Sequence, residues 1–133
     1  MSLGEPRARR VLVVDDDPNI LELIVTRLEI AGFETRRARN GQEALKRLTE
    51  FRPEAMVLDI NMPVLDGFAV LAHMQANGLT GKTATMVLTA RNNAEDVAKA
   101  VRLGARDYLS KPFKDEVLLQ RVGRLLSRVR AAN

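Results

Sequence analysis

Strand-like and helix-like patterns alternate five times along this chain of 133 residues. Short apolar runs predict strands over 10–14, 55–58 and 84–88, and two more polar strands are expected over 34–38 and 107–110. Apolar side chains at helical spacing follow each strand, the last of them over about 114–129. Because the apolar runs are typical of strands buried on both faces, the pattern predicts a parallel sheet covered by helices on both sides.

The expected architecture is an α/β fold of the flavodoxin-like type, a (βα)5 three-layer sandwich. Its parallel sheet is expected to have the strand order 2-1-3-4-5 with right-handed crossovers. The strand over 34–38 carries Arg36 and Arg37, which suits the edge of such a sheet. In open sheets of this kind ligands bind beyond the carboxyl ends of the strands, at the point where the strand order switches. Strands one and three flank that point.

Residues that start and end helices agree with this assignment. Asp17 stands before Pro18, which suits an N-cap followed by proline in the first turn. We favour this role over metal binding for Asp17. Asn40 and Glu43 resemble a capping box for the second helix, and Gly32 suits the end of the first.

Five chemically distinctive side chains follow four of the predicted strands. Asp15 and Asp16 end the first strand, Asp59 the third, Thr89 the fourth and Lys111 the fifth. Three carboxylates at one edge of a sheet require a cation, and oxygen ligands suit Mg²⁺. A lysine and a hydroxyl are what a phosphoryl group needs for charge neutralisation and a hydrogen bond, and an aspartate beside Mg²⁺ can act as a nucleophile.

Composition excludes several other kinds of site. The chain has no cysteine, so disulfides and thiolate chemistry are excluded, and the lone histidine, His73, cannot form a histidine-rich metal site. No apolar stretch approaches the roughly 20 residues of a membrane span, and residues 1–10 lack the apolar core of a signal peptide, so we expect a cytoplasmic protein without membrane contact. The net charge is +4, but the arginines are scattered and aromatic residues are few, so direct nucleic-acid binding is not expected.

Several short motifs, taken together and in order, resemble the receiver domain of two-component response regulators. The matching segments are Val11–Asp16, Leu58–Pro63, Asp66–Gly67, Leu88–Ala90 and Lys111–Phe113. The resemblance covers nearly the whole chain. It implies a receiver domain over 10–130, preceded by a disordered or cloning-derived segment over 1–9.

The resemblance implies a phosphoacceptor and a metal site. Asp59 would accept a phosphoryl group from a phosphohistidine of a sensor histidine kinase or histidine phosphotransfer protein. Asp15, Asp16, Asp59 and the backbone carbonyl of Asn61 would bind Mg²⁺, with Mn²⁺ or Ca²⁺ as substitutes. Such a domain is a regulatory phosphoacceptor that assists its own phosphorylation and dephosphorylation, and is not counted as an enzyme.

The resemblance also implies a switch. Lys111 would contact the phosphate, and the peptide bond between Lys111 and Pro112 would be cis. Thr89 would move toward the phosphate. Tyr108 would then turn inward behind Thr89, and the change would shift the face made by the fourth helix, the fifth strand and the last helix. That face would control an output domain or a downstream protein.

The resemblance also points to residues that would affect hydrolysis of the phosphoryl group and the formation of a dimer. Asn61 and Arg91 stand where the family tunes the hydrolysis rate, although Arg91 equally suits a solvated loop. A phosphorylation-dependent homodimer through the switch face is supported by Asp107 and Arg121. Val117 and Arg106 depart from the pattern of that dimer, and so weaken the case for it.

Three other functions remain as alternatives. A haloacid-dehalogenase-type phosphatase would need a general acid two residues after its nucleophile, where this chain has Asn61. A flavodoxin-like flavin binder would need a first loop that holds a phosphate, and the acidic loop over 15–17 would repel it. A pseudo-receiver used only for protein contacts would lack an acidic residue or the lysine, and none is missing.

Overall fold

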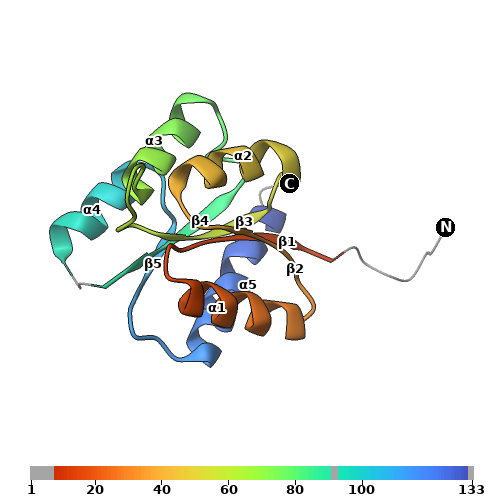
Figure 1. Cartoon of the computed structure of the whole chain (residues 1–133). Coiled ribbons are helices and arrows are strands. Elements are labelled where there is room, and N and C mark those ends of the chain that lie inside the picture. The colour runs from red at the N-terminus through yellow and green to blue at the C-terminus, as the bar shows by residue number, and fades with distance from the viewer. Residues whose placement is uncertain (1–7, 91–92, 132–133) are drawn as a thin grey trace.

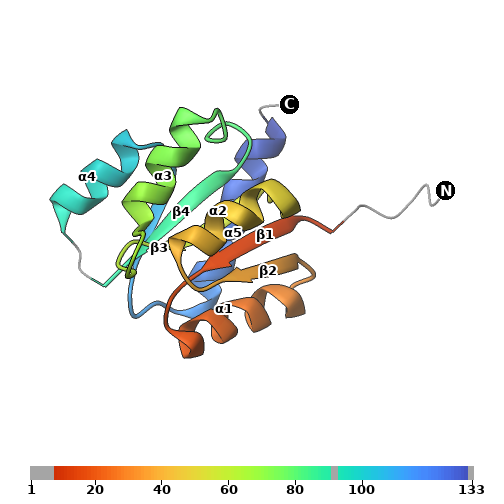
Figure 2. The ribbon, with the colours of Figure 1, turned by 45° about the horizontal axis from the view of Figure 1, so that its top comes forward.

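The computed structural model describes residues 8–90 and 93–131 of the chain. Its centre is a five-stranded parallel sheet with the order β2-β1-β3-β4-β5, which confirms the predicted topology. The strands are β1 (Arg10–Val14), β2 (Glu34–Ala38), β3 (Ala55–Asp59), β4 (Ala84–Thr89) and β5 (Asp107–Ser110). Since all neighbouring pairs are parallel, the carboxyl ends of the five strands lie at the same edge of the sheet (Figure 2).

Helices cover both faces of the sheet (Figure 1). One face carries α1 (Pro18–Ile30) and α5 (Asp115–Ala131), and the other carries α2 (Gly41–Phe51), α3 (Gly67–Ala76) and α4 (Ala94–Arg102). The three layers are those of the predicted sandwich. Among the described residues, no helix has the length and hydropathy of a membrane-spanning segment.

Alternating side chains of the inner strands divide the core into two halves. Val11 and Val13 point toward α1 and α5, whereas Leu12 and Val14 point toward α2 and α3. All four side chains are fully buried, as expected for a strand covered on both faces. The acidic residues at the carboxyl ends of β1 and β3 are therefore attached to strands whose apolar side chains are fully buried.

Polar caps start the helices that connect the strands. The side chain of Asp17 accepts a hydrogen bond of 2.9 Å from the amide of Asn19, so its predicted N-cap role is confirmed. Asn40 accepts a hydrogen bond from the amide of Glu43, and Asn93 starts α4. These caps satisfy backbone donors that a helix leaves unpaired, and they set where each loop at the carboxyl edge ends.

The N-terminal segment is only partly described. Residues 1–7 lie outside the described residues, so their predicted disorder stays a prediction. Arg9 falls in the same predicted segment, yet it forms an ion pair with Glu54 and its guanidinium donates to the carbonyl of Leu126 in α5. The ordered structure therefore begins before β1.

Candidate functional site

Two buried carboxylates meet where β1 and β3 end. The register pairs Val14 of β1 with Leu58 of β3, so the residues that follow them, Asp15 and Asp59, are neighbours across the sheet. Asp15 is fully buried, Asp59 is 3% exposed and Asp16 is exposed. One carboxylate oxygen from each of the three residues lies within 4.8 Å of the other two. The carboxyl edge of the sheet thus gathers three negative charges in a space that suits one cation.

Lys111 supplies the positive charge nearest to these carboxylates. Its Nζ lies 3.0 Å from Oδ2 of Asp15 and 3.5 Å from Oδ1 of Asp59. Among the described residues, it is the only cation that forms an ion pair with any of the three aspartates. One ammonium therefore faces three carboxylates, and the site keeps an excess of negative charge.

The environment raises the proton affinity of Asp59. Burial, followed by the negative charge of Asp15, raises the pKa of Asp59 to about 7, against the opposing effect of Lys111. Burial by itself lowers the pKa of Lys111, but its contacts with Asp15 and Asp59 outweigh this effect and the pKa is raised. The lysine thus stays charged, while ionisation of Asp59 is less favourable than for an ordinary carboxyl group and would be favoured by additional positive charge.

The carboxylate oxygens of the cluster fit a hard cation. Oδ1 of Asp15 accepts a hydrogen bond of 2.9 Å from the amide of Asp17, and Oδ1 of Asp59 accepts one of 3.3 Å from the amide of Asn61. Oδ2 of Asp15 is buried and forms the 3.0 Å ion pair with Lys111. Three carboxylates with oxygens gathered this closely are the donor set that a divalent cation such as Mg²⁺ prefers.

Strands β4 and β5 bring Thr89 and Lys111 together at the carboxyl edge. Thr89 is the last residue of β4 and is 1% exposed. It pairs in register with Ser110 of β5, and its carbonyl accepts a hydrogen bond of 2.8 Å from the amide of Lys111. The peptide bond between Lys111 and Pro112 is cis. Thr89 and Lys111, the two residues predicted to contact the phosphate, therefore lie at the edge of the sheet that carries the carboxylates.

The remaining residues of the predicted site are Tyr108, Asn61 and Arg91. Tyr108 is 41% exposed and so points away from the core. Its carbonyl accepts a hydrogen bond from Arg121, which also forms a 2.9 Å ion pair with Asp107 within the same chain. Asn61 is exposed on the loop after β3. Arg91 lies outside the described residues, so its tuning role stays a prediction.

Gly67 has a role at the site that reasoning from the sequence missed. A Cβ atom at this position would lie 2.7 Å from the carbonyl oxygen of Asp59 and 2.8 Å from Cα of Ile60. The amide of Gly67 donates to the carbonyl of Ile60 at 2.9 Å. The start of α3 thus packs directly against the backbone that carries Asp59. The pair Asp66–Gly67 was visible as a helix start, but the close approach is a tertiary contact.

Comparison with known proteins agrees with this geometry. A family model described as the response regulator receiver domain matches residues 11–123. The transcriptional regulatory protein PrrA of Mycobacterium tuberculosis is 46% identical over 119 residues, which cover 90% of this chain and 50% of PrrA. The response regulator MprA of Mycobacterium avium is 40% identical over 121 residues, which cover 91% of this chain and 52% of MprA. The chain thus spans about half the length of these curated relatives.

Solved structures show the same likeness at the level of the fold. The receiver domain of the Francisella response regulator 1452 has a TM-score of 0.84 and 34% identity, and the match covers 90% of this chain and 98% of that one. The chemotaxis protein CheY4 of Vibrio cholerae has a TM-score of 0.85 and 32% identity, with 90% of this chain and 100% of that one covered. The order of the strands, the acidic edge and these matches together place the chain in the response regulator receiver domain family.

Proposed function

We propose that this receiver domain accepts a phosphoryl group on Asp59 from a phosphohistidine of a sensor histidine kinase or histidine phosphotransfer protein. The observation that carries the proposal is the excess of charge at the carboxyl edge, where Asp15, Asp16 and Asp59 face one ammonium group, that of Lys111. This arrangement has acidic oxygens for a cation and a fixed positive charge for a phosphoryl group.

The proposed cation is Mg²⁺, for which Mn²⁺ or Ca²⁺ can substitute. Asp15, Asp16 and Asp59 would hold it with carboxylate oxygens, and Asn61 would add its backbone carbonyl. When bound, the cation supplies positive charge that ionises Asp59 and polarises the oxygens of the incoming phosphoryl group. The buried carboxylate of Asp15 supports this assignment, because it lies beside two other carboxylates and only the ammonium of Lys111 offsets their charge among the described residues.

The transfer step needs an ionised Asp59. One of its carboxylate oxygens attacks phosphorus in line with the bond to the donor imidazole. The oxygen–phosphorus bond forms as the phosphorus–nitrogen bond breaks. The electron pair of the broken bond stays on the ring nitrogen, and the ring leaves as neutral imidazole because its other nitrogen carries a proton. Lys111 would neutralise the transferred oxygens, and the hydroxyl of Thr89 would bind them.

Phosphorylation is proposed to act on the face formed by α4, β5 and α5. A phosphoryl group on Asp59 would compete with Asp15 for Lys111 and attract Thr89, which ends β4. The inward turn of Tyr108, now exposed, would follow and would alter the exposed face beside Arg121. The changed face would favour a partner, an output domain or a second copy of the chain.

The output is proposed to be transcriptional control in the cytoplasm. Relatives are named as transcriptional regulatory proteins, and one from Synechocystis, RpaA, is named as DNA-binding. These relatives are about twice as long as the matched region, so DNA binding is assigned to a part other than the receiver. The receiver itself is proposed to be regulatory, since Asn61 provides no general acid for phosphatase turnover.

Incubation with acetyl phosphate and Mg²⁺, followed by intact-mass analysis, tests the acceptor. We expect one added phosphoryl group in the wild-type chain and none in Asp59→Asn or after chelation of the cation. Labelling that persists in Asp59→Asn would assign the acceptor to another residue. Labelling that persists without a divalent cation would show that phosphorylation does not need a cation at the acidic cluster. Repeated turnover of a generic phosphatase substrate would favour the phosphatase alternative.

A further inference from the structure

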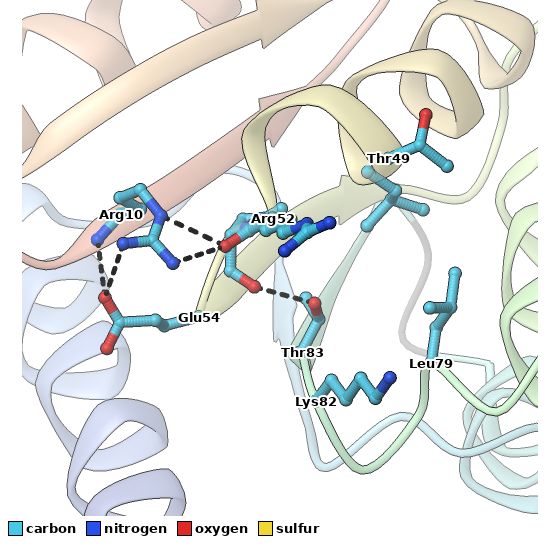
Figure 3. Close-up of a pocket in the computed structure, with 9 residues that line it drawn as sticks. Arg10, Thr49, Arg52, Glu54, Leu79, Lys82 and Thr83 are labelled. Carbon is cyan, nitrogen blue, oxygen red and sulfur yellow. Dashed lines mark hydrogen bonds and ion pairs between the residues drawn. The ribbon is translucent and has the colours of Figure 1, made fainter.

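A pocket lies at the edge of the sheet opposite to the acidic cluster. It has a volume of about 530 Å³ and is formed where α2 ends and where the loop before β4 passes. Figure 3 shows Arg52, Thr49, Leu79 and Lys82 arranged around this opening, next to the amino end of β1. The volume is within the range of small-molecule sites. Because the acceptor site lies at the carboxyl ends of the strands, both sites can be occupied at once.

Two cations line the pocket without a partner. Neither Arg52 nor Lys82 forms an ion pair with any of the residues that the structure describes. The one carboxylate in the lining, Glu54, already forms ion pairs with Arg9 and Arg10. The pocket therefore has an uncompensated positive charge that an anion would neutralise.

The backbone holds Arg52 in a conformation that its side chain does not favour. Arg52 is the C-cap of α2 with φ of +52°, in the left-handed region where glycine is the usual residue. The guanidinium of Arg10 donates to the carbonyls of Phe51 and Arg52, which fixes this turn. An arginine at a position suited to glycine departs from local preference, and such departures concentrate at functional sites.

The remaining lining is apolar, with two hydroxyl groups. Leu48 and Pro53 are buried, and Leu79 is half-buried at the opposite side of the opening. The hydroxyl of Thr83 donates to the carbonyl of Pro53 at 2.7 Å, and that of Thr49 donates to a carbonyl of its own helix. With these protons engaged, the donors that remain for an anion are those of Arg52 and Lys82.

We propose that this pocket binds a small organic phosphate monoester, with the phosphate between Arg52 and Lys82 and an apolar group against Leu48 and Leu79. A phosphate monoester carries close to two negative charges at neutral pH, which matches two unpaired cations better than a single carboxylate does. The guanidinium fork also fits phosphate oxygens in pairs. The proposal does not depend on the phosphorylation of Asp59, since it uses other residues at the other edge of the sheet.

Phenyl phosphate is the probe for this site. The ¹⁵N-labelled protein is titrated with it in the presence of a chelator, so that the acidic cluster lacks its cation. We expect saturable amide shifts at residues 48–54 and 79–83. Benzoate, with one charge, and inorganic phosphate, without the apolar group, should each bind more weakly, and phenol should not bind. Shifts confined to the loops around Asp59, or no saturable shifts, would overturn the proposal.

Three variants distinguish binding of phenyl phosphate in this pocket from a general response to the positive charge of the surface. Arg52→Gly removes the guanidinium and suits the left-handed backbone, so the fold is retained. Lys82→Gln removes the second cation, and Lys46→Gln removes a cation of α2 that does not line the pocket. The first two should weaken binding by about ten-fold or more each, and the third should leave it unchanged. Equal effects of all three would show that phenyl phosphate responds only to net charge and would refute the site.

Discussion

Lys111 reaches the fully buried carboxylate of Asp15, with Nζ 3.0 Å from Oδ2, and holds a more distant contact of 3.5 Å with Asp59. The lysine that is proposed to bind the phosphoryl group is thus paired with a carboxylate that is proposed to bind the cation. A cation at the acidic cluster would take over the charge of Asp15 and release Lys111 for the phosphoryl group. The two proposed ligands are therefore expected to support each other's binding.

Asp59→Asn is expected to stabilise the metal-free protein near neutral pH. The substitution removes a buried carboxyl group that desolvation and Asp15 make costly to ionise, and it keeps the shape of the side chain. We expect the free energy of unfolding to rise by about 2 kcal/mol, as measured by urea denaturation with a chelator present. Asp16→Asn is the control, because Asp16 is exposed and its removal should matter less. A loss of stability in Asp59→Asn would contradict the burial and repulsion assigned to Asp59.

The metal-free wild type is expected to lose stability as pH rises through the range between the two pKa values of Asp59. The pKa is about 7 in the folded protein and about 3.9 in the unfolded chain, so the folded state binds the proton more tightly. The contribution is fully present below about pH 4 and is lost by about pH 7, with an upper bound of about 4 kcal/mol. The measurement is the difference between wild type and Asp59→Asn across pH, in which other groups largely cancel. A difference that does not change with pH would contradict the raised pKa.

Mg²⁺ is expected to stabilise the wild type more strongly as pH rises toward neutrality. Binding needs an ionised Asp59, so protons compete with the cation below the raised pKa. At a concentration of about 100 times Kd, the unfolding free energy should rise by about 2.7 kcal/mol, as measured by thermal denaturation. Asp16→Asn should reduce this gain, whereas Asp107→Asn, which changes a carboxylate on β5 away from the cluster, should not. An equal gain in both variants would place the cation elsewhere.

Sequence patterns predicted the sheet order and the meeting of Asp15, Asp59, Thr89 and Lys111 because strand ends in a parallel sheet converge whatever the side-chain details. They could not separate Asp15, fully buried, from its exposed neighbour Asp16, since burial depends on how the loop turns after β1. The ion pair of Lys111 with Asp15 was also invisible, because it follows from loop geometry and not from spacing along the chain.

The orientation of exposed side chains could not be predicted from the sequence either. Tyr108 is placed at the surface, and the predicted inward state would differ from it by a side-chain rotation that no sequence pattern encodes. Asp107 and Arg121 suited an interface between two copies, yet here they pair within one chain. A dimer that used these residues would have to break this ion pair first, at a cost that is small for a partly exposed pair.

Lys111→Ala is expected to destabilise the metal-free protein and to slow phosphoryl transfer. Its removal leaves the buried carboxylate of Asp15 without a cation and raises the proton affinity of Asp59 further. We expect a loss of about 2 kcal/mol in unfolding free energy and a decrease of about 10²-fold in the labelling rate with acetyl phosphate. Mg²⁺ should restore much of the stability but not the rate, because it replaces the charge and not the contact with the phosphoryl group. Recovery of both would mean that Lys111 acts only through charge balance.

Gly67→Ala and Gly123→Ala are expected to have opposite effects on stability. The added Cβ at Gly67 would lie 2.7 Å from the carbonyl oxygen of Asp59, so α3 must move away from the backbone that carries the acceptor. We expect a loss of about 2 kcal/mol and slower labelling of Asp59. Gly123 lies within α5 with nothing within 4 Å of a built Cβ, so alanine there should add about 1 kcal/mol and leave labelling unchanged. Urea denaturation and labelling with acetyl phosphate measure both effects. Unimpaired labelling in Gly67→Ala at full occupancy of Mg²⁺ would show that the close approach of α3 serves the fold alone.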